Sequence, residues 1–187
     1  MIIVITGSVA SGKTSAANIV SKGRYPIFNA DKIVKKVYKK KLFIKRAKKK
    51  FKIKKSANIK KEIKKLIMTS KIKLGDIEKI VHPLVRKQMN LFLKKRKKYK
   101  HIILEIPLFV ESKLYKKFDN SIFIDSKRSK RLKRFKKKGG SKSLFNILDK
   151  RQINAKIKKK KCTNTVVNNS SLEVLKKRLS NIMRNYD

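Results

Sequence analysis

One short segment near the start of the chain has the residue types and the spacing that phosphate binding requires. It reads Gly7-Ser8-Val9-Ala10-Ser11-Gly12-Lys13-Thr14 and matches the pattern GxxxxGK[ST]. In such a loop the backbone N–H groups surround a phosphate, and the positive end of the following helix strengthens the attraction. The lysine reaches the β- and γ-phosphates of a nucleotide, and the threonine hydroxyl can ligate the Mg²⁺ that arrives with ATP. The segment therefore predicts a site for ATP and Mg²⁺, with Thr14 as the metal ligand.

The elements on either side of this loop fit that interpretation. Residues 2–6 form a short apolar, β-branched run that predicts a buried parallel strand. Residues 14–21 place apolar side chains at helical spacing and predict a helix. A strand, a glycine-containing loop and a helix thus follow one another in the order that phosphate binding requires.

Further along the chain, strand and helix signals alternate. Strands are predicted at residues 26–29, 101–106, 121–125 and 165–167. Amphipathic helices are predicted across residues 35–65, and a new helix is predicted to start at Pro83. Helical spacing is also found at 33–37, 75–81, 108–118, 127–138 and 143–161, and from Leu172 onward. This alternation predicts an α/β fold with a parallel sheet.

The composition is strongly basic. Of 187 residues, 56 are Lys or Arg and 11 are Asp or Glu, which gives a formal net charge of +45. Such a chain is attracted to nucleic acids and anionic membranes. The excess, however, is mostly Lys, is spread along the whole chain, and comes without a recognisable nucleic-acid-binding module. We therefore expect solvated surface charge and no specific nucleic-acid partner, with a basic nucleic-acid-binding protein carrying a vestigial nucleotide site as the alternative.

Two further features limit the class of protein. A single cysteine, Cys162, excludes an internal disulfide framework and fits a reducing compartment. No apolar run approaches the roughly 20 residues that span a bilayer, and the N-terminal residues lack a signal-peptide pattern. With 40% hydrophobic residues, the chain can still bury a core. We expect one cytoplasmic globular domain with no membrane partner.

Three more segments of the sequence have recognisable patterns. Asn29-Ala30-Asp31 is similar to a DAD motif at a strand end, with Asn29 in place of its first Asp. His82-Pro83-Leu84-Val85-Arg86 is similar to an HP-x-x-R segment, and Pro107-Leu108-Phe109-Val110-Glu111 to a PLLxE stretch. Together with the phosphate loop, and in the same order, these segments resemble those of dephospho-CoA kinases, a family of P-loop kinases. The resemblance covers nearly the whole chain.

The resemblance implies transfer of the γ-phosphate of ATP to the ribose 3′-hydroxyl of dephospho-CoA, with ATP and dephospho-CoA as substrates. It also implies an α/β P-loop kinase fold of three layers around a sheet of five parallel strands. Within a single domain, the core would comprise residues 1–31, 100–125 and 162–187, a helical acceptor-binding region residues 32–99, and a lid residues 126–161. A nucleoside or nucleotide kinase of the same fold remains an alternative, because a phosphate loop alone does not select the acceptor.

On the acceptor side, the resemblance implies roles for three residues. Asp31 would act in catalysis, accepting the proton of the acceptor hydroxyl or orienting that hydroxyl toward the γ-phosphate. The alternative role for Asp31 is to cap the N-terminus of a helix that begins near Lys32. His82 and Arg86, one helical turn apart, would bind the acceptor, with Arg86 on a phosphate oxygen. A structural role at a helix start is the alternative for His82.

On the ATP side, Lys13 is expected to act in catalysis as well as in binding. In the lid, Arg134 matches a family arginine, and Lys138 stands where a second arginine is usual. Together they would screen the charge of the transferring phosphoryl group, the alternative being two solvated bases in a basic helix. The full set of expected ATP-binding residues is Gly7, Ala10, Ser11, Gly12, Lys13, Thr14, Ser15, Arg134 and Lys138.

Four polar residues outside these sets also have expected places. Glu105 ends the strand predicted to lie beside the phosphate-loop strand, where it can hold a Mg²⁺-bound water. Glu111 is expected to cap a helix or pair with a lysine rather than touch substrate. Gln152 and Asn168 resemble family positions close to the lid and the adenine side.

Overall fold

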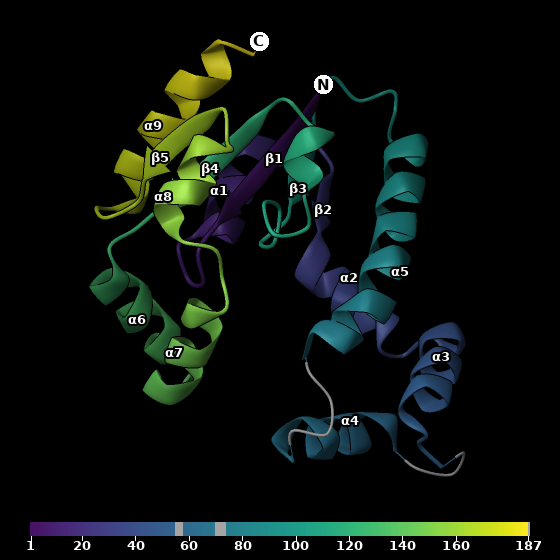
Figure 1. Cartoon of the computed structure of the whole chain (residues 1–187). Coiled ribbons are helices and arrows are strands. Elements are labelled where there is room, and N and C mark those ends of the chain that lie inside the picture. The colour runs from purple at the N-terminus through teal and green to yellow at the C-terminus, as the bar shows by residue number, and fades with distance from the viewer. Residues whose placement is uncertain (55–57, 70–73, 187) are drawn as a thin grey trace. The chain divides into compact units, whose positions relative to one another are not determined.

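The structure, a computed structural model, describes residues 1–54, 58–69 and 74–186 (Figure 1). It divides into two compact units, one formed by Met1–Asn29 and Arg96–Asp187, the other by Ala30–Lys95. Within the described ranges, no helix is both long and apolar enough to cross a membrane.

The first unit is built on a sheet of five parallel strands, as predicted, and the strands lie in the order β2-β3-β1-β4-β5. Its strands are β1 (Ile2–Gly7), β2 (Ile27–Asn29), β3 (Ile102–Glu105), β4 (Ser121–Asp125) and β5 (Asn164–Val167). The order of the strands reverses at β1, which pairs with β3 on one side and with β4 on the other. In parallel sheets, ligands bind beyond the carboxyl ends of the strands at such a reversal.

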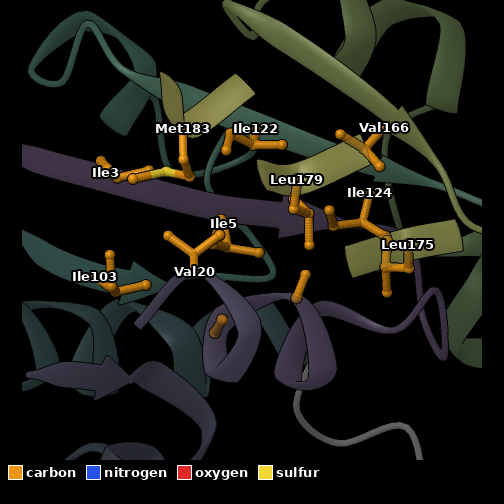
Figure 2. Packing of buried hydrophobic residues seen from close by; sticks show 12 residues of the cluster. Ile3, Ile5, Val20, Ile103, Ile122, Ile124, Val166, Leu175, Leu179 and Met183 are labelled. Atoms are coloured by element: carbon orange, nitrogen blue, oxygen red, sulfur yellow. The ribbon is translucent and has the colours of Figure 1, made fainter. Parts of the chain in front are cut away.

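The core of this unit lies between the sheet and two helices, α1 (Lys13–Ser21) and α9 (Leu172–Arg184). In Figure 2, side chains from both helices meet those of β1, β3, β4 and β5. Helical spacing of the apolar residues on α9 turns one face inward, with Leu175, Leu179 and Met183 buried. The buried core therefore fixes both ends of the loop between β1 and α1.

Three short helices follow β4: α6 (Arg128–Lys137), α7 (Lys142–Lys150) and α8 (Ala155–Lys160). The end of α6 agrees with prediction, since Gly139 follows it with a φ of 82°. The single helix predicted at 143–161 is wrong, because the chain breaks between α7 and α8. Asn154 supplies the physical reason: its side chain accepts a hydrogen bond from the Lys156 N–H at 2.9 Å and so starts a new helix.

The helix predicted at residues 108–118 is also wrong. This segment consists of turns and a single 3₁₀ helix, η1 (Leu114–Lys116). Lys113 has a φ of 57°, which no helix interior accommodates. The apolar residues that suggested a helix, Phe109, Val110 and Leu114, are buried, but turns bring them inward.

The second unit is helical and consists of α2 (Ala30–Val37), α3 (Lys41–Phe51), α4 (Ile59–Met68) and α5 (Leu74–Lys95). Amphipathic helices were predicted here, and residues 55–57 within that stretch lie outside the described residues. The helices bury a core of their own that consists of Val37, Phe43, Ala47, Ile59, Ile63, Ile77, Ile80, Val81 and Leu84.

The prediction of a helix start at Pro83 is wrong, because Pro83 lies inside α5. Proline lacks the N–H that would bond to the carbonyl four residues earlier, so it favours helix ends. Here the apolar residues on both sides of it, Ile80, Val81 and Leu84, are buried in one cluster. Burial of a continuous apolar face outweighs the lost hydrogen bond, and the helix continues.

Candidate active site

The phosphate loop joins β1 to α1, and two glycines make its shape possible. Gly7 has a φ of 153° and Gly12, the residue before the first turn of α1, a φ of 101°. A Cβ on Gly7 would lie 2.5 Å from the Ile124 carbonyl oxygen, and one on Gly12 would clash with the Asn168 side chain. Neither position therefore accepts a larger residue, and the strand, loop and helix follow the predicted order.

Lys13 folds back onto this loop. Its side chain is nearly buried, and its Nζ donates a hydrogen bond to the Ser8 carbonyl oxygen at 2.8 Å. The ammonium group thus lies over the loop's own backbone, where the N–H groups of Gly7–Thr14 would surround a phosphate. A positive charge in this place can bind the terminal phosphates of a nucleotide.

Glu105 lies at the carboxyl end of β3 and receives hydrogen bonds on both carboxylate oxygens. The Thr14 hydroxyl donates to Oε1 at 2.6 Å, and the Asn29 side-chain amide donates to Oε2. Glu105 is only 3% exposed, so the rest of the protein fixes this carboxylate. The predicted neighbourhood of Glu105 and the phosphate-loop strand is confirmed, since β3 pairs with β1.

These oxygens suit a hard divalent cation. A hydroxyl and a carboxylate oxygen are the ligand types that Mg²⁺ prefers, and Mg²⁺ usually takes only one or two of them from the protein, together with water and substrate phosphates. The described residues contain no group of three or more His, Cys, Asp or Glu side chains placed to hold a metal. The Thr14 hydroxyl and the Glu105 carboxylate therefore fit a Mg²⁺ ion that shares its coordination with water and substrate phosphates.

Arg134 reaches the phosphate loop from α6. Its Nη1 donates to the Ser11 carbonyl oxygen at 3.4 Å and to the Ser126 hydroxyl at 3.1 Å, and its Nη2 donates to the Asn168 carbonyl oxygen at 2.9 Å. Lys138, by contrast, follows the end of α6 as an exposed residue. Of the two lid bases expected at the site, Arg134 is the one that contacts the loop through a described hydrogen bond.

Sequence reasoning missed Arg131, one turn before Arg134. Arg131 is 7% exposed and contacts both Asp149 carboxylate oxygens, at 2.5 and 3.3 Å. Its Nη1 also donates to the Val9 carbonyl oxygen at 3.3 Å. Among so many basic residues nothing marked this one, and the only signal was Asp149, a rare acid in a basic stretch.

Gln152 and Asn168 both contact the phosphate loop. Gln152 Oε1 accepts a hydrogen bond from the Val9 N–H at 2.9 Å, and Asn168 Nδ2 donates to the Ser11 carbonyl oxygen at 2.8 Å. The lysine partner expected for Glu111 is Lys158, whose buried Nζ lies 2.8 Å from Glu111 Oε1.

The remaining expected residues lie in the helical unit. Asp31 is exposed in the first turn of α2, which begins at Ala30, so a helix capped by Asp31 and starting near Lys32 is not what forms. His82 and Arg86 lie one turn apart on α5, as predicted. Burial lowers the pKa of His82; Glu78, one turn earlier, raises it less, and Arg86 lowers it further. The lowered pKa of His82 favours its neutral form at pH 7.

Comparison with known proteins identifies the family. A family model described as dephospho-CoA kinase matches residues 1–173. A dephospho-CoA kinase of Fusobacterium nucleatum is 31% identical over 186 residues, covering 96% of this chain and 95% of that protein. Two solved structures share the fold, each at 23% sequence identity. A Thermus thermophilus protein has a TM-score of 0.82, and the match covers 99% of this chain and 97% of that protein. A dephospho-CoA kinase of Campylobacter jejuni has a TM-score of 0.69, and the match covers 98% of this chain and 96% of that protein. The chain belongs to the dephospho-CoA kinase family.

Proposed function

We propose that this chain transfers the γ-phosphoryl group of ATP to the ribose 3′-hydroxyl of dephospho-CoA, giving coenzyme A and ADP. Family membership over residues 1–173 supports the reaction. The observation that carries the site assignment is the arrangement at the carboxyl end of the sheet, where Lys13 lies over the phosphate loop and the Thr14 hydroxyl contacts Glu105. Phosphoryl transfer needs mainly positioning and charge neutralisation, and these groups supply both.

ATP binds, in this proposal, through the phosphate loop and the neighbouring lid. Lys13 exchanges its hydrogen bond to the Ser8 carbonyl for the β- and γ-phosphates. Arg134 is placed near enough to the loop to add a second positive charge, and Lys138 is proposed to do so from the end of α6. The proposed ATP-binding residues are Gly7, Ala10, Ser11, Gly12, Lys13, Thr14, Ser15, Arg134 and Lys138.

Mg²⁺ is proposed to enter with ATP and to be held by the Thr14 hydroxyl. When bound, the ion neutralises charge on the phosphate oxygens. Glu105 orients that hydroxyl by accepting its proton in a hydrogen bond, which leaves an oxygen lone pair of Thr14 for the metal. Asn29 in turn holds the second oxygen of Glu105.

The acceptor is proposed to bind to the helical unit. Asp31, two residues after Asn29 at the end of β2, orients the acceptor hydroxyl and takes its proton. Arg86 contacts a phosphate oxygen, and the neutral His82 beside it offers a hydrogen bond without adding charge. In this view the chain is one kinase domain, with residues 32–99 for the acceptor and 126–161 as the lid. A cytoplasmic location is part of the proposal and is supported by the single cysteine.

An acceptor panel tests the proposal. The purified chain is given ATP and Mg²⁺ with dephospho-CoA, AMP, a set of nucleosides or no acceptor, and ADP release is followed. We expect dephospho-CoA alone to stimulate release strongly. Lys13→Met, prepared in the same way, controls for contaminating kinases and is expected to lose the stimulation. Equal stimulation by AMP or a nucleoside would overturn the acceptor assignment. A dephospho-CoA-stimulated rate in Lys13→Met equal to that of the wild type, in independently purified preparations, would overturn the site.

A further inference from the structure

The phosphate loop contains a residue in a conformation that its type disfavours. Ala10, in the middle of the loop, has a φ of 56°. A positive φ brings the Cβ of an L-residue close to its own backbone, and only glycine adopts it freely. The sequence nevertheless has alanine at this position. Within the loop, the Ser11 N–H donates to the Ser8 carbonyl oxygen at 3.2 Å and closes a turn around Val9 and Ala10. Contacts from outside the loop add to this internal bond.

On the N-terminal side of Ala10, both backbone groups of Val9 are held by side chains from other elements. The Val9 N–H donates to Gln152 Oε1 at 2.9 Å, just after α7. The Val9 carbonyl oxygen accepts from Arg131 Nη1 at 3.3 Å, within α6. The peptide groups that flank Val9 are thus fixed from two directions.

On the C-terminal side, the Ser11 carbonyl oxygen is held in the same manner. It accepts a hydrogen bond from Asn168 Nδ2 at 2.8 Å, and Asn168 follows directly after β5. Ser11 itself is completely buried. Ala10 is therefore flanked on both sides by residues whose backbone is bonded to distant parts of the chain.

The side chains that make these contacts are themselves fixed. Arg131 contacts both oxygens of Asp149, and its Nε donates to the Ser126 carbonyl oxygen at 3.1 Å. Its guanidinium also lies 5.4 Å from the ring centre of Phe145. Asn168 is 7% exposed and receives a hydrogen bond from Arg134 on its own carbonyl oxygen. A side chain held so firmly can impose a shape on the loop.

We propose that Arg131, Gln152 and Asn168, here called the loop clamp, hold the phosphate loop in its ATP-binding shape against the preference of Ala10 for a negative φ. They act as positioning residues, because they contact the loop backbone and set the directions of its N–H groups. The inference rests on the ATP site proposed above. It adds that two of the three, Arg131 and Gln152, come from the predicted lid, so lid packing and loop shape depend on one another.

The clamp predicts a specific coupling between two substitutions. Gln152→Leu keeps the side chain's size and removes the acceptor for Val9, so the loop spends less time in the binding shape and the Kd for ATP rises about tenfold. Ala10→Gly removes the backbone penalty, so in the Gln152→Leu background it restores at least about half of that loss on a logarithmic scale. In the wild-type background the clamp already populates the binding shape, and the gain from Ala10→Gly is smaller.

Binding of ATP is measured by calorimetry without any acceptor, and KM and kcat are measured separately. Gln88→Leu, the same change in the helical unit, is the matched control and is expected to bind ATP like the wild type. Arg131→Lys tests the clamp in a second way and is also expected to raise the Kd for ATP. The lysine keeps a positive charge beside Asp149 but lacks the planar guanidinium that also reaches the Val9 carbonyl.

The outcomes separate the clamp from the proposed function. If wild type binds ATP and Gln152→Leu binds it equally well, the clamp is wrong and the kinase assignment stands. If Ala10→Gly changes ATP affinity by the same factor in both backgrounds, the two positions are independent and the inference fails. If the wild type does not bind ATP at all, the proposed function itself fails.

Discussion

Glu105 illustrates how a single carboxylate organises the site at the residue scale. Its two oxygens accept hydrogen bonds from Thr14, at the start of α1, and from Asn29, at the end of β2. In the family pattern an aspartate stands where this chain has Asn29. The hydrogen bond from Asn29 to Glu105 gives a physical reason for the amide at this position. An amide can donate to Glu105, whereas a second carboxylate would repel it.

Removing the negative charge of Glu105 should weaken the use of Mg²⁺. Glu105→Gln keeps the shape, but its amide nitrogen faces one of two hydrogen-bond donors, so the Thr14 hydroxyl loses its fixed orientation. We expect the Mg²⁺ concentration for half-maximal activity to rise about tenfold or more. The measurement is a magnesium titration at constant ATP, with binding of metal-free ATP as a second readout. Glu173→Gln, at an exposed position of α9, is the control, and an unaltered titration curve for Glu105→Gln would refute the role.

Asp31 is proposed to act on the acceptor, so its removal should separate catalysis from ATP binding. Asp31→Ala is expected to lower kcat at least about a hundredfold, the lower end for loss of acid–base assistance. The Kd for ATP should stay close to that of the wild type, because the phosphate loop is untouched. Rapid-quench measurement of a single turnover checks the chemical step. Near-normal turnover in this variant would show that Asp31 is not catalytic.

His82 should make stability depend on pH in a defined direction. Burial lowers its pKa in the folded protein below 6.5, so between that lower value and 6.5 the unfolded chain binds more protons than the folded one. The free energy of unfolding therefore falls as the pH drops through this window. In urea unfolding, the free energy of unfolding is expected to decrease less between pH 7 and pH 5 for His82→Asn than for the wild type. Identical losses in both proteins would contradict the burial argument.

At the scale of elements, the sequence predicts what is coded locally. The apolar strands and the helix after the phosphate loop are strong local signals, and all five strands were placed within one or two residues. The failures have tertiary causes. Turns carry the buried residues Phe109, Val110 and Leu114 inward, so their helical spacing was misleading. Proline lacks a backbone N–H and usually ends a helix, but apolar residues buried on both sides of Pro83 keep α5 continuous.

The candidate site shows the same contrast between local sequence signals and tertiary contacts. A contiguous motif predicted Lys13 and Thr14 as candidate site residues, because their spacing alone points to phosphate chemistry. Arg131 could not be predicted in this way, since its contacts to Asp149 and to the Val9 carbonyl oxygen depend on the fold, and Val9 lies far away in the sequence. Residues that support a site through tertiary contacts leave little trace in the local pattern of the chain.

Pro83 offers a test of the burial argument for α5. Pro83→Ala restores a backbone N–H to the helix interior and removes the steric conflict with the preceding turn, although the unfolded chain gains entropy. We expect the free energy of unfolding to rise by about 1–2 kcal/mol, measured by urea denaturation. Lys87→Ala, exposed on the same helix, controls for helix propensity. A destabilised Pro83→Ala would mean that the proline ring itself contributes to packing.

At the scale of the whole molecule, the net charge of +45 sets the long-range field. ATP and dephospho-CoA both carry phosphates, so a positive field raises the rate at which they meet the protein. A sequence count alone indicates this field, whereas the few carboxylates with fixed partners, such as Glu105 and Asp149, emerge only from the fold.

The field should make catalysis sensitive to salt. We expect kcat/KM for ATP to fall about tenfold or more between 0.05 and 0.5 M ionic strength, because screening shortens the reach of the charge. The value of kcat should change much less, since bound groups are screened weakly. Duplex DNA added as a competitor should inhibit only at low salt if its binding is non-specific. Inhibition that persists at 0.5 M salt would favour a specific nucleic-acid partner instead.

Following the phosphoryl group itself tests the central claim most directly. The chain is incubated with Mg²⁺, dephospho-CoA and ATP labelled at the γ-phosphate, and the products are separated and compared with authentic coenzyme A. The account predicts that the label appears in coenzyme A, at the ribose 3′ position, with one ADP formed for each molecule. Label found only in inorganic phosphate, or transferred preferentially to AMP or a nucleoside when these are added, would contradict it.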